Sequence, residues 1–168
     1  RRRGPGAAVH AGLTFLQAQQ FQIGVVLDAD GQMEISALSD LVYPLRKGRA
    51  ALVRGSRFEP GSGACKMPWI RRQAGRSLAP LASQRIGQSI RDPLSGYVAL
   101  DLAYLPEWLW PGFGYPMHLA AQVCAKGGTI IHVPVPSRPP LQGMSHHGLH
   151  RLLTVSGALW ASGQLRAR

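Results

Sequence analysis

Three oxygen-bearing side chains stand at alternate positions in the segment Asp28-Ala29-Asp30-Gly31-Gln32. They close an apolar, β-branched run that begins at Phe21 and is typical of a buried parallel strand. Ligand sites of open α/β sheets lie at the carboxyl ends of strands, and carboxylate and amide oxygens suit Mg²⁺ or Mn²⁺. The spacing therefore predicts a metal site at Asp28, Asp30 and Gln32, with a diphosphate as a further ligand. The alternative is a polar turn in which Asp30 caps the next helix.

A further carboxylate, Asp92, precedes a proline in Arg91-Asp92-Pro93-Leu94-Ser95-Gly96-Tyr97. The residue before proline favours an extended backbone, so Asp92 could act as a base or position a sugar hydroxyl. Otherwise the segment is a plain Asp-Pro turn. A third candidate is the segment 143–150, which holds three histidines but no Cys or acid. Neutral, hydrogen-bonding or phosphate-facing histidines are expected there rather than a metal site.

The chain is strongly basic, with a net charge of +11 over 168 residues. Nine Lys or Arg side chains and a single acid, Glu59, fall between Arg46 and Arg76. Such a patch attracts phosphate groups of a nucleic acid, an anionic membrane or a phosphorylated substrate, unless it is only a solvated face. No zinc-finger spacing, RNA-recognition motif or clear recognition helix accompanies the charge, so nucleic acid is not expected as a partner.

Composition and patterning predict one α/β domain. The apolar fraction of 45% excludes a disordered chain, and two cysteines give no disulfide framework, which favours a cytosolic setting. Helices are expected over 7–20, 35–47, 69–86, 117–125 and from 149 onward, and strands over 21–28, 50–53, 97–100 and 129–135. The helix over 69–86 is expected to bury Ile70, Ala74, Leu78, Leu81 and Ala82. Because the strand ending at Asp28 needs neighbours, the chain is expected to begin part-way through its domain.

Five motifs occur in an order and spacing that resemble the family 2 glycosyltransferases. They are the segments 4–12, 28–32, 55–57 and 92–97, and the segment 133–139 followed by 143–148. Dolichyl- or polyprenyl-phosphate mannosyl- and glucosyltransferases of the GT-A fold are the most similar group. The resemblance covers nearly the whole chain. It implies a Rossmann-like, three-layer α/β/α sheet that lacks its first strands, with a partial GT-A domain over 1–148 and an amphipathic, membrane-interfacial helix over 149–168.

The resemblance also implies an inverting transfer of a sugar from a nucleotide-sugar donor to a lipid phosphate at the cytoplasmic membrane face. It assigns the metal and the donor diphosphate to Asp28, Asp30 and Gln32, with Gly4 and Gly6 on the donor side. It assigns catalytic roles to Asp30, Arg57, Arg76 and Asp92. It places the acceptor phosphate near Arg57, Arg72, Arg76, Arg138 and Ser145.

The chemistry of such a transfer agrees with a site rich in arginine. An acceptor phosphate is already an anion and can attack the sugar without a dedicated base, so the protein must chiefly hold two anions together. This sequence has His147 where relatives often carry Tyr, and Pro139-Pro140 where a second Arg is common. Two other functions fit the residues: a non-catalytic basic module that binds nucleic acid or an anionic membrane, and a transferase with a saccharide acceptor.

Overall fold

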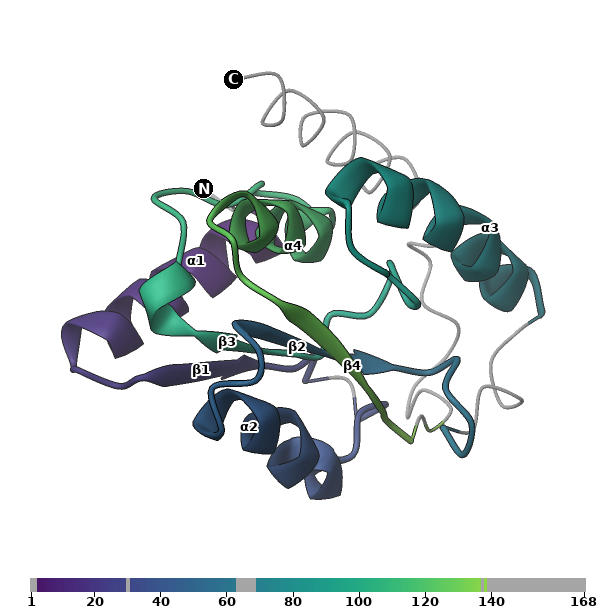
Figure 1. Ribbon diagram of the computed structural model, residues 1–168, viewed down its shortest axis with the longest axis horizontal. Helices are drawn as coiled ribbons and strands as arrows, with labels where there is room; N and C mark the ends of the chain where they lie inside the picture. The colour runs from purple at the N-terminus through teal and green to yellow at the C-terminus, as the bar shows by residue number, and fades with distance from the viewer. Residues whose placement is uncertain (1–2, 30, 63–68, 137, 139–168) are drawn as a thin grey trace.

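The computed structural model describes residues 3–29, 31–62, 69–136 and 138, which form a sheet with helices on both faces (Figure 1). The described strands are β1 (Ile23–Val26), β2 (Leu52–Ser56), β3 (Val98–Asp101) and β4 (Ile130–Pro134). They lie in the order β1-β3-β2-β4. β3 is antiparallel to both of its neighbours, whereas β2 and β4 are parallel.

The helices form one layer on each side of this sheet. The described helices are α1 (Pro5–Ala18), α2 (Leu38–Arg46), α3 (Trp69–Ile86) and α4 (Tyr115–Ala125), with short 3₁₀ turns η1 (Ile35–Ala37) and η3 (Leu102–Tyr104). α1, α3 and α4 lie over one face, and α2 covers the other (Figure 1). The predicted three-layer α/β/α architecture is confirmed.

Side-chain alternation along the central strands divides the core in two. Leu52 and Leu100 point into the larger core, under α1, α3 and α4, whereas Val53 and Ala99 point into the smaller core, against α2. Successive strand residues face opposite sides of a sheet, so each strand supplies both cores.

The run that ends at Asp28 forms a strand, but not the central parallel strand that its composition predicts. β1 pairs antiparallel with β3, from Ile23 opposite Asp101 to Val26 opposite Val98, and stands at one end of the described order. Among its residues only Gly24 is fully buried. An apolar, β-branched run indicates a buried strand, but it does not show whether the neighbouring strand is parallel or antiparallel.

Strand β2 differs from its predicted bounds of 50–53 because a distant segment pairs with its second half. β4 supplies parallel partners for Gly55 and Ser56, so β2 continues to Ser56. A Cβ atom on Gly55 would lie 2.7 Å from Cγ1 of Val135, so only glycine fits at this point of the sheet.

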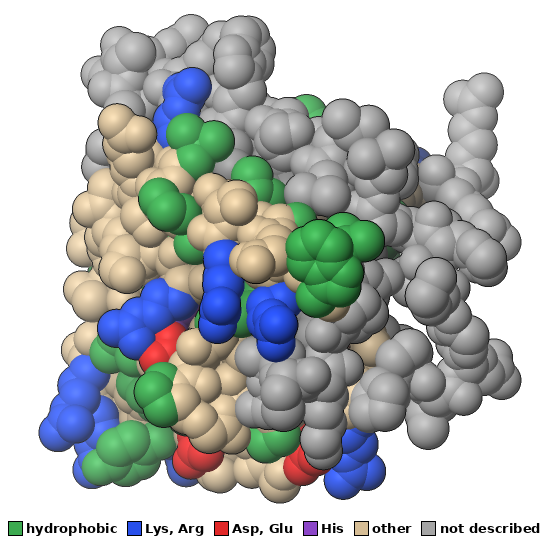
Figure 2. Space-filling model, turned by 90° about the vertical axis from the view of Figure 1, so that its right-hand side faces the viewer, with side chains coloured by type: hydrophobic (Ala, Val, Ile, Leu, Met, Phe, Trp, Pro, Cys, Tyr) green, Lys and Arg blue, Asp and Glu red, His purple; other side chains and the backbone are tan. Residues whose placement is uncertain are grey.

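Helix α3 has the predicted bounds, and part of its predicted core face is buried. Leu78 and Ala82 pack into the larger core as predicted, and Ile86 joins them. The other predicted core residues Ile70 and Leu81 are exposed. Figure 2 views the molecule from the side on which α3 lies. Apolar side chains lie directly beside Lys and Arg side chains near the middle of that view, and the visible acidic groups lie lower.

The membrane-interfacial helix predicted over 149–168 lies outside the described residues. Within the part of the chain that the structure describes, no helix combines the length and the apolar character needed to cross a bilayer.

Candidate functional site

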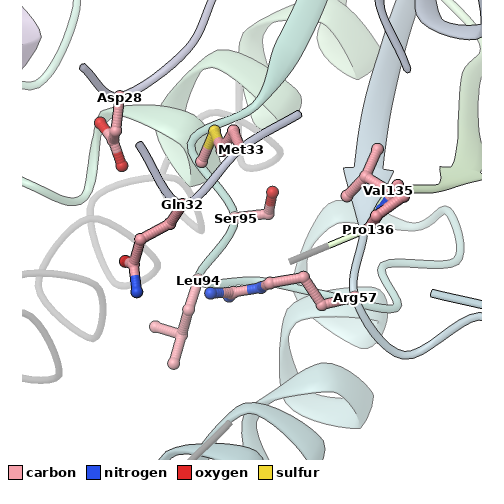
Figure 3. Close-up of a pocket in the computed structure, with 8 residues that line it drawn as sticks. All are labelled: Asp28, Gln32, Met33, Arg57, Leu94, Ser95, Val135 and Pro136. Carbon is pink, nitrogen blue, oxygen red and sulfur yellow. The ribbon is translucent and has the colours of Figure 1, made fainter. Parts of the chain in front are cut away.

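A shallow pocket lies where the chain leaves the carboxyl ends of β1, β2 and β4 (Figure 3). Because β3 is antiparallel, the loop that precedes it arrives at this same edge. Eight residues from four separate segments line the pocket: Asp28, Gln32, Met33, Arg57, Leu94, Ser95, Val135 and Pro136. Three of the predicted site residues, Asp28, Gln32 and Arg57, are therefore brought together.

Arg57 is held by a two-pronged ion pair with Asp92. Its Nε lies 2.7 Å from Oδ2 of Asp92 and its Nη2 lies 2.9 Å from Oδ1. The backbone N–H of Arg57 also donates to Oδ2, at 3.1 Å. Asp92 is buried, whereas Arg57 stays partly exposed at the pocket. Paired bonds of this kind fix the guanidinium plane as well as its position.

A second arginine, Arg54, lies fully buried behind the pocket. Its Nη1 donates to the carbonyl of Pro116 at 2.8 Å, and its Nη2 donates to the carbonyls of Asp92 at 3.0 Å and Ser95 at 3.3 Å. Arg54 thus ties the centre of the sheet to α4 and to the loop that carries Asp92. Burial lowers the pKa of Arg54 to about 10, although the charge of Asp92 opposes this shift.

The two arginines keep Asp92 ionised. Burial alone would raise the pKa of Asp92, but the charge and hydrogen bonds of Arg57, with the charge of Arg54, outweigh burial and lower it. A buried carboxylate whose pKa is lowered and whose two oxygens both accept hydrogen bonds from Arg57 is a weak and inaccessible base. Its geometry instead supports a positioning role for Asp92, which holds Arg57 toward the pocket.

Asp28 lies on the opposite wall, against the backbone of the loop that follows Asp92. A Cβ on Gly96 would lie 3.4 Å from Oδ2 of Asp28 and 3.2 Å from the hydroxyl of Tyr115. Figure 3 shows Asp28 and Gln32 on one side of the pocket and Arg57 reaching in from the other. The pocket therefore offers oxygen donors on one wall and a guanidinium on the facing wall.

The segment after β4 is bound to the loop after β1 by an ion pair and a backbone hydrogen bond. Arg138 donates from its Nε to Oε1 of Glu34 at 2.9 Å, and from its backbone N–H to the carbonyl of Gln32 at 3.0 Å. The hydroxyl of Tyr97 donates to the carbonyl of Glu34 at 3.3 Å. Arg138 is thereby placed beside the pocket residue Gln32, rather than against Arg57.

Other predicted site residues lie at varying distances from this pocket. Gly6 donates its N–H to the carbonyl of Pro111 at 2.8 Å, and both Gly4 and Gly6 pack against the turn at Trp110 and Pro111 rather than lining the pocket. Their donor role stays a prediction.

The two predicted acceptor-site arginines of α3 lie near Phe58 or within the helix surface. Arg76 has its guanidinium carbon 6.0 Å from the ring centre of Phe58, and Arg72 is partly buried on the same helix. Asp30 and Ser145 lie outside the described residues.

Sequence reasoning missed the buried support of the site. It treated Arg54 as one charge of a basic patch, and a lone Arg inside an apolar strand is the signal that could have marked it. It assigned no role in the pocket to Met33, Leu94, Val135 or Pro136, although the last three lie within the motif segments 92–97 and 133–139. The chemistry of an apolar side chain does not mark it as a pocket residue, because only the fold brings these four side chains together.

Comparison with curated proteins decides the family. The chain is 33% identical over 166 residues to an uncharacterized glycosyltransferase of Mycobacterium bovis, spanning 96% of this chain and 68% of that protein. The chain belongs to the glycosyltransferases. It is also 27% identical over 140 residues to the polyprenol monophosphomannose synthase of Mycolicibacterium smegmatis, spanning 79% of this chain and 51% of that protein. No family model matches the chain.

Solved structures support the same fold. Glucosyl-3-phosphoglycerate synthase from Mycobacterium tuberculosis, in complex with UDP, superposes with a TM-score of 0.71 at 22% identity. The match covers 96% of this glycosyltransferase chain but only 55% of the solved chain. Further structures of that synthase contain Mn²⁺, UDP-glucose and phosphoglyceric acid. The predicted GT-A type of α/β fold is confirmed.

Proposed function

We propose that this glycosyltransferase moves a sugar of the mannose or glucose type from a nucleotide-sugar donor to a polyprenyl or dolichyl phosphate. The observation that carries the proposal is the pocket, which sets Asp28 and Gln32 against a fixed Arg57. The similarity to a polyprenol monophosphomannose synthase supports the lipid acceptor. A lipid-linked acceptor would place the reaction at a membrane, and the family resemblance favours its cytoplasmic face.

The donor set of the pocket fits a divalent cation. Asp28 and Gln32 contribute a carboxylate and an amide oxygen, the hard ligands that Mg²⁺ and Mn²⁺ prefer. Asp30 would be the third ligand. Within the described ranges, which omit Asp30, no group of three or more His, Cys, Asp or Glu could hold a metal. When bound, the cation supplies Lewis-acid stabilisation of the diphosphate leaving group.

The residues of this chain would do the rest by binding and orientation. Arg57, fixed by Asp92, presents its guanidinium to an incoming phosphate anion and holds it near the donor. Arg72, Arg76, Arg138 and Ser145 would add to this acceptor site. Because the acceptor is an anion already, no residue has to remove a proton from it. Gly4 and Gly6 would act indirectly, through the turn at Pro111 on which they pack.

The direct test measures nucleotide release by the full-length gene product from UDP- and GDP-sugars, with a short-chain polyprenyl phosphate as acceptor. We expect activity with Mn²⁺ or Mg²⁺, none after chelation, and a loss of about 100-fold or more in Asp28→Asn and Asp30→Ala. Asp40→Asn, which removes an exposed acid of α2, is the matched control and should retain full activity. Metal-independent turnover would contradict the proposed mechanism.

A parallel acceptor series distinguishes the remaining functions. Phosphoglyceric acid, found in a structural neighbour, tests a soluble phosphate acceptor, and a free saccharide tests an acceptor without phosphate. If saccharides are preferred and Arg57→Gln keeps its activity, the phosphate acceptor is wrong. Salt-sensitive binding of DNA or RNA without any transfer would favour the basic binding module instead.

A further inference from the structure

The outer face of α3 combines apolar and basic side chains that the core does not use. Exposed residues recur along the helix at the spacing of a single face. They are Trp69, Ile70, Gln73, Arg76, Ser77, Pro80, Leu81 and Gln84. Trp69 is 66% exposed and Ile70 is 64% exposed, which is unusual for neighbouring side chains of this size.

The charge around this face has one sign. α3 contains four arginines and no acid, and the chain carries no Asp or Glu between Glu59 and Asp92. These two flanking acids are themselves engaged, Glu59 with Arg91 and Asp92 with Arg57. Arg76 and Arg85 are exposed, so the surface of α3 next to the exposed Trp and Ile carries positive charge. Figure 2 shows apolar and basic side chains side by side on this side of the molecule.

The same helix adjoins the pocket. Phe58, which follows Arg57, packs its ring on α3, where a Cβ on Gly75 would lie 2.8 Å from Cζ of Phe58. Arg76 lies over that ring. A surface that binds the outer face of α3 would therefore lie near the pocket residue Arg57.

We propose that the outer face of α3, led by Trp69, Ile70 and Arg76, docks on an anionic lipid bilayer. The inference rests on the proposed function, since it names the surface through which a lipid phosphate reaches Arg57. Trp is favoured at the boundary between lipid head groups and acyl chains, and Ile adds apolar burial there. Each arginine near an anionic leaflet adds attraction that salt weakens.

The test measures sedimentation of the full-length gene product with vesicles of phosphatidylcholine, with or without phosphatidylglycerol. We expect binding to the anionic vesicles that weakens with salt. In the double variant Trp69→Ser, Ile70→Ser it should fall by about tenfold or more. Arg76→Gln should weaken binding to anionic vesicles only. The matched control removes Phe15 (64% exposed) and Phe21 (57% exposed) as the double variant F15S/F21S, on the α1 side of the molecule, and should bind as the wild type does.

The outcomes keep the docking surface separate from the proposed function. Circular dichroism should show that W69S/I70S is folded, and transfer to a soluble short-chain polyprenyl phosphate should be unchanged in it. Equal vesicle binding by W69S/I70S and the wild type would overturn the docking surface even if transfer is confirmed. A wild-type dimer that W69S/I70S abolishes, without vesicle binding, would also overturn it in favour of a protein partner. Vesicle binding that depends on Trp69 and Ile70, without transfer to any lipid phosphate, would leave the surface standing and refute the proposed acceptor.

Discussion

The side chain of Arg54 is buried, and its hydrogen-bond partners are backbone carbonyls of α4 and of the loop that carries Asp92. Its two terminal nitrogens satisfy three backbone carbonyls, so its removal would leave buried acceptors without donors. We expect Arg54→Met to lower the free energy of unfolding by about 3 kcal/mol in urea denaturation. Arg54→Lys keeps the charge but not the planar set of donors, so its free energy of unfolding should lie between those of the wild type and Arg54→Met. Arg49→Met, at an exposed arginine, should have little effect, and equal losses at both positions would contradict this account.

A half-buried histidine, His132, makes the stability depend on pH. His132 lies on β4 opposite Arg54, and burial, together with Arg54 and Arg91, lowers its pKa to about 4. The unfolded chain binds a proton near pH 6.5 and the folded chain does not, so stability is complete above that pH and is lost as pH falls toward 4. The loss is at most about 3 kcal/mol.

The check is a series of unfolding experiments between pH 7 and pH 4. His132→Asn should flatten the decline in the free energy of unfolding relative to the wild type. Asp92, whose pKa is lowered, contributes stability that disappears only at still more acid pH. An unchanged slope in His132→Asn would show that other groups control the acid response.

At the scale of elements, substitution of two glycines of α1, Gly6 and Gly12, tests whether Gly6 serves helix packing or donor binding. A Cβ on Gly6 would overlap the carbonyl oxygen of Trp110, whereas a Cβ on Gly12 would meet no atom within 4 Å. We expect Gly6→Ala to destabilise the fold by about 2 kcal/mol or more, because the turn at Trp110 must shift. Gly12→Ala should stabilise it by about 0.5–1 kcal/mol through helix propensity.

Thermal unfolding of both variants checks this prediction. If Gly6→Ala keeps its stability but raises KM for the nucleotide sugar, Gly6 contacts the donor as the family resemblance implies. If it loses stability alone, the glycine serves the packing of α1 against the turn.

Local pattern predicted the elements better than their partners. The bounds of α3 were correct because helix propensity and apolar periodicity are local. Its predicted core residues Leu78 and Ala82 do pack in the core, but Ile70 and Leu81 are exposed. The extension of β2 to Ser56 depends on β4, which lies far along the chain. In the same way, Asp28 and Gln32 were recognisable from their chemistry and Arg57 from the family resemblance. Arg54 gains its role only from the carbonyls that the fold places around it.

At the scale of the whole molecule, the contact between Arg138 and Glu34 joins the two ends of the described sheet region. Both side chains are partly exposed, and pairs of that kind contribute at most about 1 kcal/mol to stability. Glu34→Gln should therefore leave the unfolding temperature nearly unchanged. It should speed hydrogen exchange at the Arg138 amide, which is bonded to the carbonyl of Gln32. Ser36→Ala, which removes an exposed side chain that hydrogen-bonds Glu34, is the control. Equal exchange in all three proteins would show that the ion pair does not hold the segment.

The antiparallel course of β3 has a consequence for how the enzyme matures. Since four segments distant in sequence meet at one sheet edge, the pocket has no precursor in any single helix or hairpin. Local helices form quickly, whereas pairing of distant strands is slow. In a refolding experiment, helical circular dichroism should return well before the capacity to turn over nucleotide sugar. The return of catalytic activity would then mark the last step of folding, in which the distant strands pair.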